Sequence, residues 1–220
     1  MSGGSVEDNA NGREGAAIPD DRDIGRPLAL SDGVFAIAIT LLTFQLQVTQ
    51  PLANSKSWSE LASAISDIEP KLESYTITFL VLGAYWMAHH RLFRGIMSYD
   101  RPLLLLNLLY LLGVGFTPFP ASLVGTYPSN PLAVVIYAGN LAWLSACSGI
   151  IGRHAQSAGL SARPRSAYLM GQWRAWCSVM ILLLSMPVAI LSARWAQYFW
   201  LLLWPALYFV TRKAAATRPA

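Results

Sequence analysis

The chain has 220 residues, of which 54% are hydrophobic and only 13% are charged. Charged residues make up roughly 25% of an average soluble domain, so a soluble domain of this length would have too little charge to cover its surface. The formal net charge of +4 is therefore expected to reflect membrane topology, and no nucleic-acid partner is expected.

Long stretches of the chain contain no ionisable side chain. Between Arg101 and Arg153, between Arg174 and Arg194, and between Arg194 and Arg212 there is no Asp, Glu, Lys, Arg or His. Apolar runs of about 20 residues are typical of membrane-spanning helices. The sequence therefore predicts an all-α integral membrane protein with six transmembrane helices.

Along the chain, the predicted elements are a polar tail, six spans and a second short tail. Residues 1–25 are rich in Gly, Asp and Asn, lack the hydrophobic core of a signal peptide and predict a disordered cytoplasmic tail. The first span is expected at about 27–48, and the helical spacing of apolar residues predicts an amphipathic surface helix at 55–68. The other spans are expected at about 70–93, 102–124, 131–151, 167–191 and 195–210, so that residues 26–213 form the transmembrane domain and residues 214–220 a cytoplasmic tail. Pro118 and Pro120 should bend or end the third span.

Lys and Arg residues are distributed unevenly between the predicted loops. If the N-terminus lies in the cytoplasm, Lys56, Lys71 and Arg194 are the only ones of the 16 Lys and Arg residues that fall on the outer side. Such an excess of positive charge marks the cytoplasmic side of a membrane protein. Both termini are therefore expected to face the cytoplasm.

The head of the first span carries Arg26, Ser31 and Asp32 before an uncharged run. An ionisable side chain in a transmembrane segment is energetically expensive, and it marks a packing or functional site by default. Asp32 is expected to fix the geometry between helices, and its partner must lie on another helix because Arg26 is six residues away on the same one. Candidate partners at the same depth are His89, His90, Arg91 and Asn107.

Apolar residues form a narrow stripe along the first span. At about 100° per residue, Ile37, Leu41 and Phe44 share one side of the helix. Thr40 lies beside them, whereas Asp32 points the other way. On this pattern alone, ordinary helix packing is the favoured interpretation, since almost every buried helix shows such a row. If the stripe instead faces a symmetry axis, Asp32 faces the bundle of its own subunit.

No other group of residues predicts catalysis or metal binding. Adjacent helical residues such as His89 and His90 point about 100° apart and rarely hold one ion, and no Cys or carboxylate spacing supports a metal site. Cys147 and Cys177 both fall inside predicted spans, so a disulfide is not expected. The sequence contains no Ser-His-Asp arrangement, phosphate-binding glycine loop or HExxH motif, and neither an enzyme nor a bound cofactor is expected.

The first span resembles the signature of the transmembrane protein 175 family, the endolysosomal-type potassium channels. That signature is an Arg, three variable residues, Phe-Ser-Asp, then Gly-Val-Phe-Ala-Ile and a Thr-Leu-Leu close behind. Leu30 stands where the family has the Phe. The matching residues are Arg26, Ser31, Asp32, Gly33, Val34, Phe35, Ala36, Ile37, Thr40, Leu41 and Leu42, and the similarity continues through Trp86, His89-His90-Arg91-Leu92-Phe93, Asn107-Leu108, Phe116 and Pro118-Phe119.

Resemblance to the bacterial branch of this family implies a homotetramer of six-span subunits in the inner (plasma) membrane, whose first helices line a central pore. It implies a pore constriction at Ile37, Leu41 and Phe44, with Thr40 as a polar lining residue. It also implies a hydrogen-bonded network that holds the first helix in place, formed by Arg26, Ser31, Asp32, Asn107 and either His89 or His90.

The resemblance further implies a passive, potassium-permeable cation channel, with potassium ions and membrane lipids as its partners. The Thr-Val-Gly-Tyr-Gly filter of ordinary potassium channels is absent from the chain, and a ring of isoleucines would instead gate by dewetting. The alternative is a secondary transporter of a cation or small solute, a class that usually has inverted repeats and broken helices near the midplane. The sequence shows no convincing repeat of this kind.

Overall fold

The computed structural model describes residues 25–47, 57–193 and 195–196, and within them the β-type pairing consists of one bridge between Ile96 and Ser161. The remaining regular structure is helical, which confirms the predicted all-α class. The helices are α1 (Gly25–Leu41), α2 (Trp58–Asp67), α3 (Glu69–Phe93), α4 (Arg101–Phe116), α5 (Pro118–Thr126), α6 (Pro131–Ser157) and α7 (Arg165–Leu191), and a 3₁₀ turn, η1 (Leu42–Gln45), extends α1.

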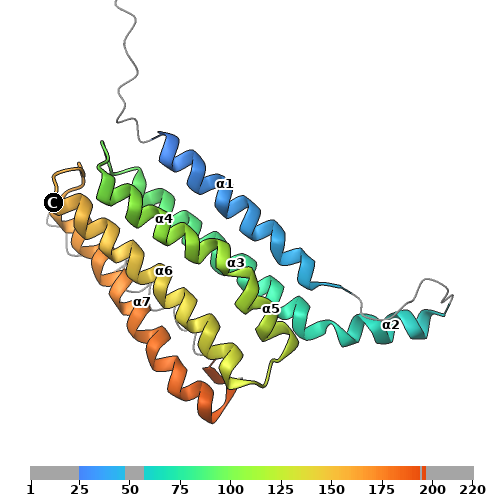
Figure 1. The fold of residues 1–220 in the computed structure, drawn as a ribbon. Helices are drawn as coiled ribbons and strands as arrows, with labels where there is room; N and C mark the ends of the chain where they lie inside the picture. Colours follow the sequence, from blue (N-terminus) through green and yellow to red (C-terminus); the bar gives the residue numbers. More distant parts are fainter. Residues whose placement is uncertain (1–24, 48–56, 194, 197–220) are drawn as a thin grey trace, which may run out of the picture.

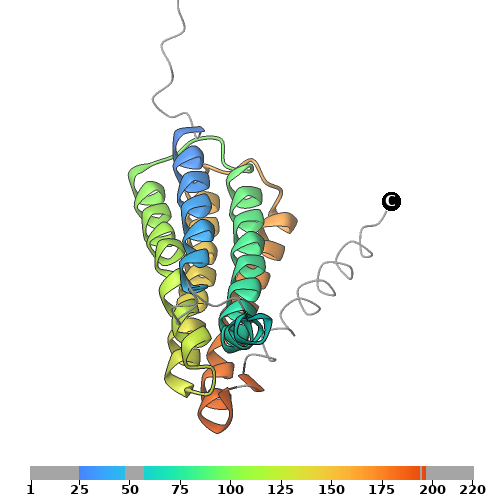
Figure 2. The same cartoon turned by 90° about the vertical axis from the view of Figure 1, so that its right-hand side faces the viewer.

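The helices stack in layers across the bundle (Figure 1). α1 lies on one side of the bundle and packs against α3, α4 and α5. α6 packs against α4 and α5 on the other side, and α7 covers the outer face of α6. Figure 2 shows α1 in front of α3 and α4, with α6 and α7 behind them. One face of α1 therefore has no other helix of the described chain against it.

Four helical stretches of the described chain are long and apolar enough to cross a membrane: Gly25–Gln45, Arg101–Thr126, Pro131–Ser157 and Arg165–Leu191. They agree with four of the predicted spans and make the chain a multi-pass membrane protein. α3 has 25 residues, but Lys71, Glu73 and its basic C-terminal end keep it out of this group. The predicted span at 195–210, apart from Trp195 and Ala196, and the predicted tails, apart from Gly25, lie outside the described residues.

α4 and α5 are two halves of one predicted span, interrupted at Thr117. Pro118 and Pro120 have no backbone N–H to continue the hydrogen-bond ladder of α4. Thr117 Oγ1 donates to Gly113 O (2.9 Å) and accepts a hydrogen bond from Asn140 Nδ2 on α6 (2.9 Å). The break is thus anchored to the neighbouring helix, and α4 ends just before the two prolines that were expected to bend or end the span.

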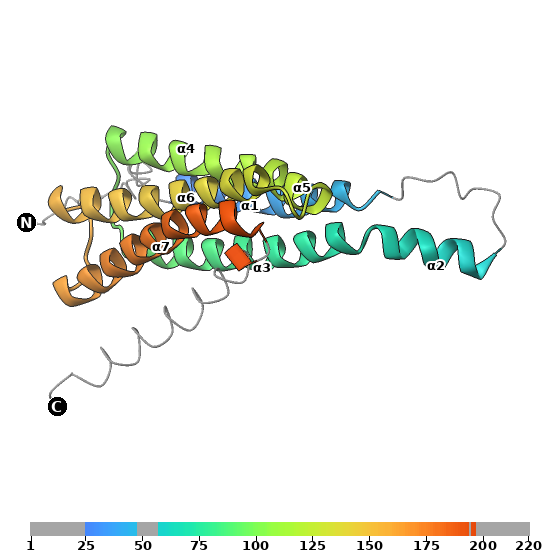
Figure 3. The ribbon, with the colours of Figure 1, turned by 90° about the horizontal axis from the view of Figure 1, so that it is seen from below.

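α2 continues α3 with only Ile68 between them, and it projects beyond the other helices of the bundle (Figure 3). The predicted amphipathic segment at 55–68 is therefore helical over 58–67. Its large apolar side chains Trp58, Leu61 and Ile65 are exposed, Trp58 to 89%, whereas the small Ala64 is buried. This exposure is compatible with the predicted surface helix, although α2 extends α3 and does not fold back over the bundle.

One end of the bundle, which we call the arginine-rich end, is where α3 and α6 end and α4 and α7 begin. The loop after α3 and the loop before α7 pair there through backbone hydrogen bonds from Met97 N to Leu160 O (2.8 Å) and from Ala162 N to Gly95 O (3.0 Å). These bonds hold two connections that are distant in sequence against each other. The arginines near this end are Arg91, Arg94, Arg101, Arg153, Arg163 and Arg165.

Asp100 links the start of α4 to the end of α6 at the arginine-rich end. Its carboxylate accepts hydrogen bonds from Leu103 N (2.8 Å), which caps α4, and from His154 Nε2 (2.8 Å). Burial raises the pKa of Asp100, but the hydrogen bonds from Leu103 and His154 outweigh burial and leave the pKa below its usual value.

Replacing Asp100 with Asn is expected to weaken the dependence of the protein's stability on pH in the acid range. Asn retains a cap for Leu103 N but loses the charge that attracts His154. Because the pKa of Asp100 is lowered in the folded chain, its contribution is present above the ordinary pKa of 3.8 and is lost as the pH falls below that value. The melting temperature of the purified protein, followed from about pH 7 to about pH 3, should fall less steeply in the variant. Identical profiles for the two proteins would contradict this expectation.

Candidate functional site: the first helix and its buried network

The packed face of α1 consists of small and apolar side chains. Ser31, Phe35, Ala38 and Leu42 are each at most 1% exposed. They follow one another at intervals of four, three and four residues, which is the spacing of one helical face. This face lies against α3 and α4, so the rotation of α1 about its own axis is set by these contacts.

The opposite face of α1 carries the apolar stripe expected from the sequence. Leu30, Ile37, Leu41 and Phe44 are 52%, 60%, 41% and 68% exposed. Thr40 is also exposed and lies beside this row. In a membrane protein, a row of large exposed apolar side chains contacts lipid, another subunit or an ion path. All the residues predicted for the constriction thus lie on a face that is free in the single chain.

The hydroxyl groups near the stripe bond to their own helix. Thr40 Oγ1 donates to Ile37 O (2.8 Å), and Thr43 Oγ1 donates to Thr40 O (2.8 Å). These bonds use the hydroxyl protons and leave oxygen lone pairs free to accept. The exposed Thr40 oxygen can therefore face a cation without losing its own hydrogen bond.

A chain of buried hydrogen bonds joins α3, α4 and α1. His89 Nε2 on α3 donates to Asn107 Oδ1 on α4 (2.9 Å), and Asn107 Nδ2 donates to Ser31 Oγ on α1 (3.1 Å). Ser31 Oγ donates in turn to Pro27 O (2.8 Å). His89, Asn107 and Ser31 are each at most 2% exposed, so these bonds form away from water. The structure thus brings together three of the residues that the resemblance implies for this network.

Aromatic rings hold His89 in its place within this chain. Its ring stacks on Phe93 (4.3 Å between centroids) and on Tyr110 of α4 (4.9 Å), and Phe35 of α1 lies 5.9 Å away. Among the described residues His89 Nδ1 has no hydrogen-bond partner. The ring therefore acts as a neutral donor through Nε2, surrounded by aromatic groups from three helices.

Asp32 has a partner that the sequence prediction did not name. Trp86 Nε1 on α3 donates to Asp32 Oδ1 (2.8 Å), and the Trp86 ring lies against the ring of His90 (5.7 Å between centroids). Asp32 is therefore attached to α3 beside the His89 chain, through an indole and not through a histidine. It lies away from the apolar stripe, as the helical wheel predicted.

Two residues of the predicted network are not joined to it in the described part of the chain. Arg26 is exposed and makes none of the hydrogen bonds of the buried chain. His90 touches the Trp86 ring, and its Nδ1 is buried without a hydrogen-bond partner in the same part. The signal that could have identified Trp86 is its spacing of three residues from His89, which puts both on one side of α3.

The described residues contain no group of three or more His, Cys, Asp or Glu side chains placed to hold a metal ion. The polar side chains that join α1 to α3 and α4 are those of Ser31, Asp32, Trp86, His89 and Asn107, which suit hydrogen bonding between helices. The chemistry that this site can support is therefore positioning of α1.

Comparison with known proteins gives matches over the part of the chain that contains α1 and the buried network. The family profile described as endosomal/lysosomal potassium channel TMEM175 matches residues 26–118. A potassium channel of Streptomyces collinus is 39% identical over 103 residues, or 47% of this chain and 48% of that protein. A potassium channel of Chamaesiphon minutus is 33% identical over 143 residues, or 64% of this chain and 70% of that protein.

More distant matches include a vertebrate protein and a solved structure. The endosomal/lysosomal proton channel TMEM175 of Danio rerio is 33% identical over 130 residues, which cover 58% of this chain and 22% of that protein. The crystal structure of a lysosomal potassium-selective channel TMEM175 homolog from Chamaesiphon minutus matches with a TM-score of 0.73 and 23% identity, covering 87% of this chain and 97% of that one. The two chains share a fold.

Proposed function

Because the chain belongs to the TMEM175 family, we propose that it is a passive, potassium-permeable cation channel in which four copies surround a central pore lined by α1. The observation that carries the proposal is the uncovered apolar stripe of Ile37, Leu41 and Phe44 on the outer face of α1. Two bacterial relatives are named potassium channels, which supports the choice of ion. Their names, like those of the vertebrate relatives, are channel names, in agreement with the expectation that the chain is not an enzyme.

In the proposed assembly, four copies of Ile37 form the narrowest ring, with Leu41 and Phe44 one and two turns further along. A narrow apolar ring sheds water, so it can block ions without any plug. Conduction then requires the ring to become wide enough to stay wet. The Thr40 oxygens next to this ring can replace part of the hydration shell of a potassium ion.

The buried network supports the orientation of α1 in this proposal. The bonds from Asn107 to Ser31 and from Trp86 to Asp32 attach one side of the helix to its own subunit. Ile37 is on the opposite side and is 60% exposed. A polar network on one side and an uncovered apolar stripe on the other suit a helix that is held by its subunit and turned toward an axis.

The proposed topology has the arginine-rich end at the cytoplasmic face, with both termini inside the cell. The excess of Lys and Arg near this end supports that orientation, because positive residues are retained on the cytoplasmic side. The inner membrane of a bacterium is the proposed location, in line with the bacterial relatives.

Ion flux from liposomes tests the proposed function. Purified protein is reconstituted into potassium-loaded vesicles without valinomycin, and a protonophore balances the charge. Potassium should then leave the vesicles down its gradient. A secondary transporter would need a second substrate on the opposite side of the membrane and would turn over far more slowly than a pore. Potassium release that depends on such a substrate would overturn the channel assignment in favour of the transporter.

Replacing Thr40 with Ala is expected to lower the permeability of potassium relative to sodium. The change removes the exposed hydroxyl oxygen beside the proposed ring but leaves Ile37 and its apolar stripe in place. Reversal potentials in planar bilayers under mixed potassium and sodium gradients give the ratio directly. Thr43→Ala is the matched control, because Thr43 makes the same bond to its own helix but lies on a different side of α1. An unchanged ratio in Thr40→Ala would exclude this hydroxyl from ion selection.

A further inference from the structure

A cavity of about 630 Å³ lies between α3, α6 and α7, next to the arginine-rich end. Its volume is in the range of sites that bind small molecules or lipid fragments. Much of the wall is apolar, and a group of hydroxyl and amide side chains lies on the α6 and α7 sides. The residues that the argument uses are Arg91, Arg163, Arg174, Gln172, Val81 and Leu92.

Three arginines from different elements meet at this cavity. Arg91 is near the end of α3, Arg163 lies in the loop before α7, and Arg174 is in the third turn of α7. Burial and the nearby charge of Arg91 both lower the pKa of Arg163, and Arg174 is close enough to Arg91 for the two charges to repel each other. The single ion pair in the described residues is Asp100–His154, so none of these three arginines has a carboxylate partner there.

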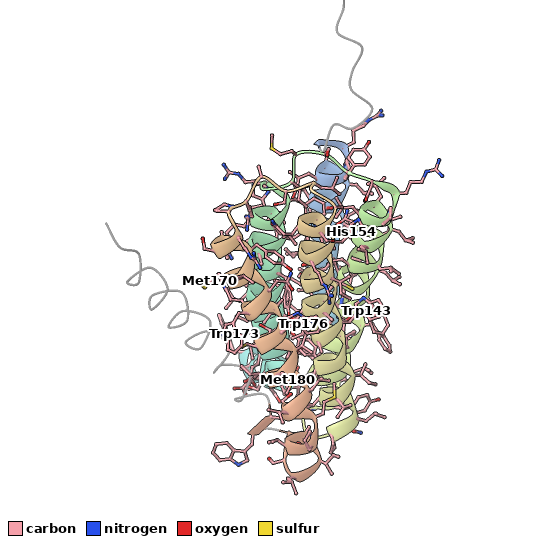
Figure 4. The ribbon with its side chains drawn as sticks, turned by 90° about the vertical axis from the view of Figure 1, so that its left-hand side faces the viewer. Trp143, His154, Met170, Trp173, Trp176 and Met180 are labelled. Carbon is pink, nitrogen blue, oxygen red and sulfur yellow. The ribbon has the colours of Figure 1, made fainter. Side chains whose placement is uncertain are left out.

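The position of Arg163 is fixed by the backbone around it. Its side chain crosses Gly95, where a Cβ atom would overlap it, and its guanidinium donates to Arg91 O. The wall formed by α7 is held to α6 by Gln172, whose Nε2 donates to Gly149 O (2.7 Å). Figure 4 shows Met170, Trp173, Trp176 and Met180 along α7, beside α6 with Trp143 and His154. Arg163 and the α7 wall that carries Arg174 are therefore held in place by contacts with the rest of the bundle.

The depth of the site identifies the kind of anion that it suits. Arg174 is nine residues after the start of α7, which is about 13 Å along the helix. This distance takes the guanidinium from the helix end toward the boundary between lipid headgroups and acyl chains. Basic pockets between transmembrane helices on the cytoplasmic side are typical sites for anionic lipid headgroups.

We propose that this cavity binds an anionic phospholipid from the leaflet at the arginine-rich end. Arg91, Arg163 and Arg174 hold the phosphate, and the acyl chains lie along the apolar wall that includes Val81 and Leu92. The negative phosphate reduces the repulsion among three like charges that have no carboxylate partner in the described chain. This binding does not depend on ion conduction, so it can be tested on protein whose channel activity has not been measured.

Native mass spectrometry of the full-length protein in a non-ionic detergent tests the proposal. The wild-type protein is expected to retain phosphatidylglycerol in preference to phosphatidylcholine, and phosphatidylglycerol should raise its melting temperature. Arg174→Gln should weaken phosphatidylglycerol binding about 10-fold, because one charge-assisted hydrogen bond is lost. Arg153→Gln is the matched control, since Arg153 is exposed on α6 near the same end but does not line the cavity.

Arg91→Gln provides a second variant in case Arg174→Gln does not fold, because the Arg91 side chain is exposed and Arg163 bonds only to its backbone oxygen. Weaker binding in Arg91→Gln with unchanged binding in Arg153→Gln would support the site. Equal losses in the cavity variants and in Arg153→Gln would mean general surface attraction and would overturn it. Stabilisation by inorganic phosphate alone, equal to that by the lipid, would overturn the lipid assignment. Equal retention of both lipids would mean that the negative charge of the headgroup does not determine binding, and it would overturn the proposal as well.

Discussion

Ile37→Asn should give larger currents that discriminate less between potassium and sodium. In the proposed pore, four isoleucines form the apolar ring, and four amides in their place would keep the path wet. The conductance of single channels in planar bilayers should rise several-fold, and the reversal potential under mixed gradients should move toward that of a non-selective pore. The change is expected to be tolerated by the fold, because Ile37 is 60% exposed and is not among the buried core residues.

Leu112→Asn is the matched control for this experiment. Leu112 lies on α4, is 67% exposed and receives the same polar side chain at a similarly uncovered apolar position. It is not on α1, so its replacement should leave conductance and ion preference unchanged. Equal effects of the two substitutions, or no effect of Ile37→Asn on currents, would show that α1 does not line the path.

Asn107→Leu is expected to lower stability and to alter conduction together. The substitution removes the acceptor of His89 Nε2 and the donor to Ser31 Oγ, so a buried donor on α3 loses its partner. Leaving a buried polar group unpaired costs about 1–3 kcal/mol, and each kcal/mol corresponds to roughly 2–4 °C in melting temperature for a chain of this size. With the bond to Ser31 absent, α1 loses part of its attachment, and the currents should become unstable or smaller.

Asn140→Leu separates these two effects. Asn140 is another buried asparagine that donates to a hydroxyl group, Thr117 Oγ1 at the junction of α4 and α5, and this bond does not involve α1. Its replacement should lower the melting temperature by a comparable amount and leave single-channel currents unchanged. If both variants alter the currents in the same way, the effect reflects general loss of stability and the proposed role of Asn107 in holding α1 is wrong.

The fold was largely predictable because the apolar runs that a bilayer requires leave a strong signal in the sequence. The helices α6 and α7 cover the stretches expected from hydropathy, α1 with η1 covers the first of them as far as Gln45, and the interruption at Thr117 follows from the two prolines behind it. The two faces of α1 were also predictable, since a helix repeats every 3.6 residues. The repeat puts Ile37 on the side away from Asp32, but only the structure shows that this side is uncovered, since the pattern alone favoured ordinary helix packing.

The partners inside the bundle could not be predicted, because they depend on how three helices meet. Asp32 bonds to the Trp86 indole, which was not among the candidate partners expected at its depth. The aromatic surroundings of His89 require the relative rotation of α1, α3 and α4, which no spacing along one helix encodes. The same holds for Arg163, whose route across Gly95 depends on the pairing of two distant loops.

The buried bonds between α1 and its neighbours limit how the proposed pore can widen. Spinning α1 by one residue, about 100°, would separate Ser31 from Asn107 and carry Phe35 out of the core. Each bond of this kind contributes roughly 0.6–2 kcal/mol in a membrane, and a buried Phe roughly 1.5–3 kcal/mol, so an isolated spin is unfavourable. In the proposed tetramer, a wider path would therefore require α1 to move together with α3 and α4 as one unit.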